Sequence, residues 1–386
     1  MKYFAIISLL AIVVLGVSVA AFALDYNADL SLSLSEQYND NIFLSHTDRV
    51  GDFITVINPA LALSTKTDKI DAMLNYSPSL NYYASHDEKN DISHQASGQG
   101  LFRLTERLSV GLSDTFVQTK ESSIINNTPS LQGAGPLAAG QNKITTNTLS
   151  GNLSYRFSEK LTFQPSVTYT TTDNTQTGVG DNNTYTGAML ATYLLTDRTS
   201  LKANASYSYY AYTVSSDAYG QVYTIGVTHK FTPTFTVDAY GGINVTTIKE
   251  PSNTDTGFTG GLTVTKTFEK GSASIALTDG IVPGLQGTSP LKSQVITLNY
   301  SRPLTAALDS SLSAWYGRYR SIGNIGLGQN SNYMGGNAGL SYKLTSWANL
   351  FLSYSYLNSD DNVNKSGSYH NQIITAGIKL SKQAKF

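Results

Sequence analysis

The sequence predicts an all-β protein, a transmembrane antiparallel β-barrel of the up-and-down type with about 18 strands. Three observations predict this fold class. Apolar and polar residues alternate along nearly the whole chain after residue 23, an apolar leader precedes the alternating part, and the chain ends on the aromatic residue Phe386. Alternation with a period of two is typical of strands that have one apolar and one polar face.

The first 23 residues have the pattern of a secretory signal peptide. Lys2 is followed by an uncharged apolar run over residues 4–19, and Ala21-Phe22-Ala23 has the small-x-small form of a cleavage site. An uncleaved membrane helix is the alternative, but the apolar run is shorter than a typical span. The sequence therefore predicts a signal peptide over residues 1–23 and a barrel over residues 24–386, exported to the outer membrane of a Gram-negative bacterium.

The composition agrees with a barrel. Only 14% of residues are charged, whereas 25 tyrosines are present, as expected for a polar lumen with aromatic rims. The net charge of −1 argues against nucleic acid as a partner, because a nucleic-acid surface needs a basic stripe. The absence of cysteine excludes disulfides, thiolate metal sites and covalent c-type haem attachment. We expect no cofactor; the expected partners are outer-membrane lipid and the barrel-assembly machinery.

Tight turns rich in turn-forming residues punctuate the alternating segments. In outer-membrane barrels such turns face the periplasm, and both chain termini lie on the same side. Eight turns of this kind are predicted, near residues 66–68, 105–107, 158–160, 196–198, 232–233, 269–271, 302–303 and 345–346.

Longer Gly- and Asn-rich connections alternate strictly with the tight turns and are expected to be the outer loops. Together, eight turns and nine loops give about 18 strands, or sixteen if one weak pair merges. The predicted loops lie near residues 39–51, 85–91, 120–143, 173–183, 214–217, 249–256, 282–290, 321–331 and 359–367.

Charged residues fall mainly on the inward face of the predicted strands, because a lipid-facing Lys or Arg costs roughly 2–4 kcal/mol at the midplane. The residues expected to line the lumen by this parity are Arg103, Arg156, Lys202, Asp238, Asp309 and Lys343. Asp114 is an exception, since it shares the phase of Leu112 and Phe116. A β-bulge near Ser113 is expected to turn it inward.

Three inward tyrosines near the outer rim, Tyr83, Tyr210 and Tyr212, are further candidates for lining the lumen. They have two possible roles: their rings could stack on sugars, or they could belong to the aromatic girdle. The longest loop, residues 121–143, carries Gly133, Gly135, Pro136 and Gly140. It is either a constriction loop that folds into the pore or a surface loop.

The last segment resembles the recognition strand that the barrel-assembly machinery reads. Ile374, Ile378 and Leu380 share one phase with the terminal Phe386, which is the expected assembly signal.

Residues 36–44 and 48–59 carry a more specific resemblance. They comprise a Tyr, a run of Asn and Asp, the apolar triplet Ile42-Phe43-Leu44, and a second apolar strand that ends at Pro59. The stretch resembles the opening of an outer-membrane β-barrel porin family that is associated with exopolysaccharide and exosortase gene clusters. The resemblance implies a barrel through which a polymer or another solute crosses the outer membrane.

Catalysis and metal binding have little support in the sequence. The five histidines are scattered and have no nucleophile or acid at a recognisable spacing, so no enzyme is expected. Asp40, Asp48 and Asp52 could hold calcium, but Asp residues in loops more commonly hydrogen-bond their own backbone.

Three functions remain open. The first is a passive conduit for secreted polysaccharide, with a polysaccharide-export partner, as the family resemblance implies. The second is a diffusion porin for small solutes, since 16 to 18 strands leave a water-filled channel. The third is a sheath around a partner such as a multihaem cytochrome, which would have to bring every haem itself.

Overall fold

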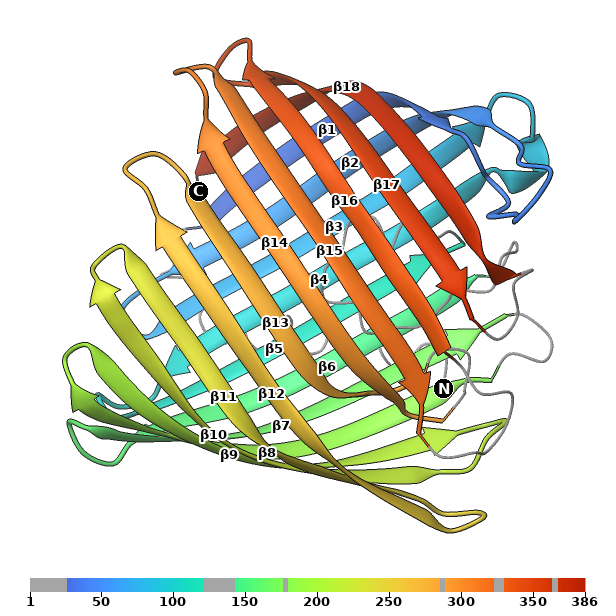
Figure 1. The fold of residues 1–386 in the computed structure, drawn as a ribbon. Helices are drawn as coiled ribbons and strands as arrows, with labels where there is room; N and C mark the ends of the chain where they lie inside the picture. The colour runs from blue at the N-terminus through green and yellow to red at the C-terminus, as the bar shows by residue number, and fades with distance from the viewer. Residues whose placement is uncertain are drawn as a thin grey trace.

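The computed structural model describes residues 26–120, 143–175, 180–284, 289–322, 330–362 and 367–385. These residues form 18 antiparallel strands around one lumen (Figure 1). The strands are β1 (Tyr26–Asn39), β2 (Asp52–Lys66), β3 (Ile70–Tyr83), β4 (Asp91–Arg103), β5 (Leu108–Thr119), β6 (Ile144–Arg156), β7 (Leu161–Asn174), β8 (Asn182–Thr196), β9 (Thr199–Tyr212), β10 (Ala218–Thr232), β11 (Phe235–Ile248), β12 (Asn253–Thr267), β13 (Ser272–Val282), β14 (Leu291–Pro303), β15 (Leu308–Ser321), β16 (Asn330–Lys343), β17 (Ala348–Asp361) and β18 (Tyr369–Lys385).

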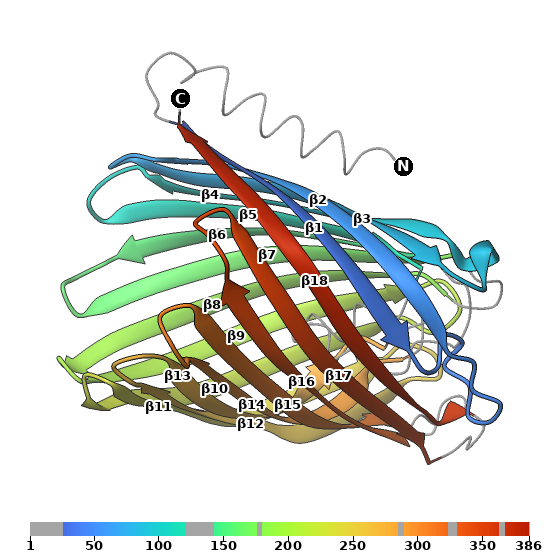
Figure 2. The same cartoon turned by 90° about the horizontal axis from the view of Figure 1, so that it is seen from above.

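The barrel closes between its first and last strands. β1 pairs with β18 from Asn27↔Lys385 to Asn39↔Ile373, so the two strands lie side by side (Figure 2). Every other strand pairs with its neighbours in sequence. The structure thus confirms the closed, up-and-down antiparallel barrel and the count of 18 strands rather than sixteen. A short helix, η1 (Asp87–Lys89), lies between β3 and β4, and no helix among the described residues is long and apolar enough to cross a membrane.

All eight predicted tight turns lie at one end of the barrel, and the longer connections lie at the other. We call these the tight-turn end and the long-loop end. Four of the turns share one device, in which a Ser or Thr hydroxyl accepts a hydrogen bond from the backbone three residues later. The four hydroxyls belong to Thr67, Thr105, Ser158 and Thr305, at 2.9 to 3.1 Å from the nitrogen.

The two faces of the wall differ in chemistry. Apolar side chains such as Leu201 on β9 and Leu352 on β17 project outward and are exposed. The inward face of β6–β9 instead carries rows of hydroxyls that bond across neighbouring strands. Ser150 lies 3.1 Å from Thr168, and Thr186 lies 2.9 Å from Ser208. An apolar outer belt around a polar lumen is the arrangement that a lipid bilayer stabilises.

An aromatic girdle marks the long-loop end of β7–β10. The outward rings of Tyr169, Tyr185, Tyr209 and Tyr219 follow one another at centroid distances of 4.9, 6.1 and 5.2 Å. Rings of this kind favour the boundary between hydrocarbon and headgroups, because one end is apolar and the other polar. The girdle therefore marks the edge of the apolar belt at the long-loop end of these strands.

The prediction of a β-bulge near Ser113 is wrong. β5 keeps an unbroken register with β4 and with β6, so Asp114 stays on the outward face with Leu112. It is nevertheless buried, and Asn147 on β6 donates a hydrogen bond of 2.7 Å to its carboxylate. A partner on the next strand, rather than a local distortion of the backbone, stabilises the polar group.

Two expectations about the ends of the chain fall outside the described residues. These are the signal peptide over residues 1–23 and the assembly signal at Phe386. The first described strand, β1, lies within the predicted barrel domain of residues 24–386.

Candidate functional site: the lumen and its long-loop mouth

The connection between β1 and β2, residues 40–51, turns into the barrel. Ile42 is buried and packs against Ile54, Val56 and Tyr83, which form one apolar cluster with it. Ile54 alternates along β2 with Phe53, whose ring is exposed on the outer wall. The cluster is therefore on the lumen side, and the connection lies against the inner wall.

A lysine holds this connection from the next loop. The ammonium of Lys89, in η1, donates a hydrogen bond of 2.7 Å to the carbonyl of Ile42 and lies 4.3 Å from the ring centroid of Phe43. Phe43 also meets the His86 ring edge-on. His86 in turn lies 2.8 Å from the carboxylate of Asp52. Buried polar groups that are satisfied in this way make a loop rigid.

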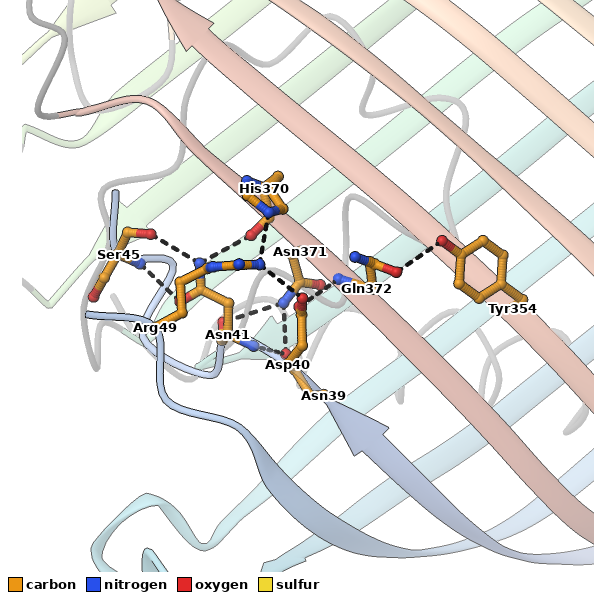
Figure 3. Close-up of polar contacts among 9 residues, drawn as sticks. All are labelled: Asn39, Asp40, Asn41, Ser45, Arg49, Tyr354, His370, Asn371 and Gln372. Carbon is orange, nitrogen blue, oxygen red and sulfur yellow. Dashed lines mark hydrogen bonds and ion pairs between the residues drawn. The ribbon is translucent and has the colours of Figure 1, made fainter. Parts of the chain in front are cut away.

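A polar network ties the same connection to β18, at the seam of the barrel (Figure 3). The side chain of Asn41 donates to the carbonyls of Ser45 and His370, both at 2.9 Å, and accepts from the Ser45 backbone. Asn371 donates to the Asn39 side chain and to the Asn41 carbonyl. The network joins residues more than 320 positions apart in sequence.

Charged groups extend this network on the outside of the seam. Asp40 accepts from the backbone of Gln372 at 2.7 Å and from Arg49 at 3.0 Å. Arg49 also lies 2.6 Å from the Nε2 atom of His370 (Figure 3). The beginning and the end of the barrel are therefore locked together by the first connection.

Leu44 carries the connection further around the inner wall. It packs with Leu357 on β17, Tyr369 on β18 and the indole of Trp315 on β15. Its backbone is left-handed, with φ of 52°, a conformation that a leucine adopts only when its surroundings impose it. The buried contacts of the Leu44 side chain supply that constraint.

The described residues directly after β13 also turn inward. Gly284 accepts a hydrogen bond at 3.5 Å from the side chain of Asn182, on β8. Four strands separate β8 from β13 in the sheet, so Gly284 lies far from its own strand, against the inner wall at β8. Leu291, at the start of β14, is fully buried with Tyr319 and Tyr333 in a second inward cluster. We call residues 40–51 and the described residues that follow β13, 283 and 284, the mouth segments.

The three predicted tyrosines all project inward, but none offers a free ring to the lumen. Tyr83 packs on Ile42, and Tyr210 and Tyr212 pack with Ala218 and Ile248. Each is no more than 8% exposed. Neither sugar stacking nor membership of the outward girdle describes them, because they form the inner wall beneath the mouth segments.

Tyr240 is an inward aromatic residue on β11 that was not predicted from the sequence. Its side chain remains 38% exposed. Its ring lies beside Gly261 on β12, where an added Cβ would stand 2.5 Å from it, and Gly226 flanks it on β10. Parity with Asp238 could have identified it, since both lie on the inward face of the same strand.

The charged residues predicted to line the lumen all have inward parity, but they lie towards the tight-turn end rather than at the mouth. Lys202 and Thr228 both hydrogen-bond the carboxylate of Asp238. Arg103 donates to the Asp68 carbonyl at 3.4 Å. The other three occupy the ends of their strands and are exposed: Arg156, Asp309 and Lys343. Opposite signs are mixed, so no ladder of a single sign results.

Other predicted features are not brought together. Gly133, Gly135, Pro136 and Gly140 lie outside the described residues. Asp40 pairs with Arg49, and Asp52 pairs with His86. Over the described ranges no group of three or more His, Cys, Asp or Glu residues is arranged to hold a metal ion.

A charged contact anchors the long-loop rim outside the strands. Asp217, just before β10, accepts hydrogen bonds from Tyr209 at 2.7 Å and Lys249 at 3.1 Å. These contacts, the bond from Tyr209 most of all, hold the pKa of the Asp217 carboxyl below its usual value, although its partial burial acts in the opposite direction. Contact with Tyr219 and Asp217 raises the pKa of Lys249.

No known protein family matches the sequence, and no curated protein matches it. Solved structures of outer-membrane proteins align with most of this chain at low identity and with TM-scores below 0.5. OpdK of Pseudomonas aeruginosa, solved with vanillate, has 9% identity and a TM-score of 0.49, over 92% of this chain and 99% of that one. OccAB4 of Acinetobacter baumannii has 11% identity and a TM-score of 0.48, over 93% and 98%. The FrpB iron transporter of Neisseria meningitidis has 8% identity and a TM-score of 0.49, over 95% of this chain and 83% of that one.

Proposed function

We propose that this barrel is a diffusion channel of the Gram-negative outer membrane, which passes small polar solutes and carries out no chemistry itself. The observation that carries the proposal is the contrast between the wall and the mouth. Uncharged hydroxyls and amides line much of the wall, while the mouth segments turn inward at the long-loop end. Such a pore selects by size and hydration rather than by charge.

The inward mouth segments favour small solutes over a polymer. A conduit for secreted polysaccharide needs an open mouth, whereas residues 40–51 are fixed on the inner wall by Ile42, Leu44 and the Asn41 network. A sheath around a cytochrome needs a large complementary inner surface, which a wall of small hydroxyl side chains does not offer. We therefore rank the polymer conduit and the sheath below the porin.

Planar-bilayer recording and liposome swelling test the proposal together. We expect stable conductance steps with weak ion selectivity, and swelling rates that fall steeply from monosaccharides to trisaccharides. A properly folded barrel that conducts no ions would contradict an open channel. Passage of long oligosaccharides at rates close to those of glucose would instead support the polymer conduit.

Orientation completes the proposal: the tight-turn end faces the periplasm and the long-loop end faces outward. Short turns on the periplasmic side are the arrangement that bacterial barrels share. A protease site inserted after Ser215, in the connection before β10, should be cut on intact cells. A site inserted in the turn at residues 305–306 should be cut only after the outer membrane is opened.

A further inference from the structure

The outward face of β14–β17 carries an apolar groove of about 550 Å³. Its floor consists of small residues, Ala314 on β15 and its register partner Gly336 on β16, with Ala338 beside them. Larger side chains border the floor: Ile296, Leu298, Leu312, Tyr316, Met334 and Tyr354. All six are exposed, whereas Trp315 and Tyr333, between them in sequence, pack in the interior. The groove therefore opens towards the membrane and away from the lumen.

Positively charged side chains lie directly beyond the groove, towards the long-loop end. On the same face, the next row of register partners after Ile296 and Tyr316 is Gln294 and Arg318. The row after that is Lys292 and Arg320. Successive rows are about 7 Å apart along a strand. Arg318 therefore lies in the first row beyond the apolar lining of the groove.

Two of these cations, Arg318 and Arg320, have no ion pair within the described part of the wall. Lys292 faces Asp279 at 3.7 Å, but no ion pair joins Arg318 or Arg320 to a described carboxylate. The Nε atom of Arg318 is buried and has no acceptor among the described residues. The other nearby carboxylate on this face, Asp360, lies on β17 beyond Asn332. A buried guanidinium nitrogen without a partner is costly, so an anion at this place would be stabilised.

We propose that this site binds one lipid with a phosphorylated headgroup from the outer leaflet. An acyl chain occupies the groove over Ala314 and Gly336, and Arg318, Arg320 and Lys292 bind the phosphate. The spacing suits such a molecule, because the cations lie at the edge of the apolar belt and the groove runs from there into it. The proposal rests on membrane insertion with the long-loop end outward.

Native mass spectrometry of the refolded full-length protein tests the site, with diphosphoryl lipid A as the probe. Two variants attack the two halves of the site: Arg318→Gln/Arg320→Gln removes charge, and Ala314→Trp fills the groove. Their matched controls are Arg302→Gln, at the opposite end of β14, and Ala203→Trp, an exposed outward alanine on β9. Heat-modifiable migration on gels confirms that each variant folds.

We expect one lipid A on the wild type and on both controls, and a roughly tenfold loss of affinity in each site variant. Removing the phosphates from lipid A should weaken binding to the wild type as much as removing the arginines. Equal binding of the dephosphorylated lipid, unchanged binding in Ala314→Trp, or full competition by inorganic phosphate would each overturn the proposal. Single-channel conductance, measured on the same variants, should remain that of the wild type, which separates this test from the test of the channel.

Discussion

Asp114 lies on the outward face of the wall and depends on a single neighbour. Asn147 donates a hydrogen bond of 2.7 Å to its carboxylate, and both side chains are buried. Because a buried acceptor that loses its donor bears the full cost of its desolvation, the pair is worth more than an exposed hydrogen bond.

Replacing Asn147 with Leu should therefore lower the free energy of unfolding by about 2 kcal/mol. Urea-induced unfolding in lipid vesicles measures the change. The double variant Asp114→Leu/Asn147→Leu, in which neither polar group remains, should recover most of the loss. If Asn147→Leu alone is neutral, the pair does not stabilise the wall.

Asp217 gives the long-loop rim a dependence on pH. A carboxyl whose pKa is lowered by folding stabilises the folded state above its unfolded value, near 3.8, and this contribution disappears as the pH falls through the folded pKa. The wild type should therefore lose stability as the pH falls below about 3.8, partly through this group.

The variant Asp217→Asn should be less stable than the wild type at pH 7 and nearly equal to it at pH 2. Thermal unfolding followed by gel migration at a series of pH values measures the difference. Asp255→Asn, an exposed change on the inward face of β12, is the control and should keep the dependence of the wild type. The same gap between Asp217→Asn and wild type at every pH would argue against the assigned role.

At the scale of elements, the connection of residues 40–51 lies against the inner wall, where we expect it to narrow the pore. Two different attachments hold it: the apolar contacts of Ile42 and Leu44, and the hydrogen bonds of Asn41. Loops that carry function are often held in this way by a rigid scaffold.

Releasing the apolar attachment should widen the pore. We expect Ile42→Asp/Leu44→Asp to raise single-channel conductance about twofold, since conduction follows the open cross-section. The control is Thr47→Asp, at an exposed position in the same connection. A conductance equal to that of the wild type would mean that these residues do not limit the pore.

Removing the polar attachment should make the mouth fluctuate without opening it fully. Asn41→Ala leaves the Ser45 backbone and two carbonyls without a partner, a loss of about 1–3 kcal/mol in local stability. Hydrogen exchange at Ser45 and current noise should both rise. Asn75→Ala, on the inward face of β3, should change neither.

At the scale of the whole molecule, closure depends on close contact at the seam. A Cβ added to Gly377 on β18 would stand 2.5 Å from the Leu34 carbonyl of β1 and 2.6 Å from the ring of Phe351. The backbones of the first and last strands therefore approach too closely at this point for any larger residue.

We expect Gly377→Val to prevent closure and to abolish the heat-modifiable form on gels, because the β1–β18 ladder cannot form around it. Gly187→Val is the matched control, since an added Cβ there meets nothing within 4 Å. If Gly377→Val migrates normally and has the single-channel conductance of the wild type, this account of the seam is contradicted.

Much of the architecture could be predicted because its signals are local. Alternation assigns each strand an inner and an outer face, and hydroxyls such as Thr67 and Thr305 mark turns within four residues of sequence. The inward placement of Lys202 and Asp238 follows from parity alone, and the structure adds that they pair.

The sequence by itself determined the barrel, the sites of its tight turns and the chemistry of each face, because a period of two and short turns are properties of neighbouring residues. The structure decided that the strands number 18 rather than sixteen. Only the tertiary structure decided that Ile42 and Leu44 turn inward, that Tyr83 and Tyr212 are buried, and that Asn41 meets His370 across the seam. These contacts join distant segments. Their partners are brought together by closure of the sheet, which no local pattern encodes.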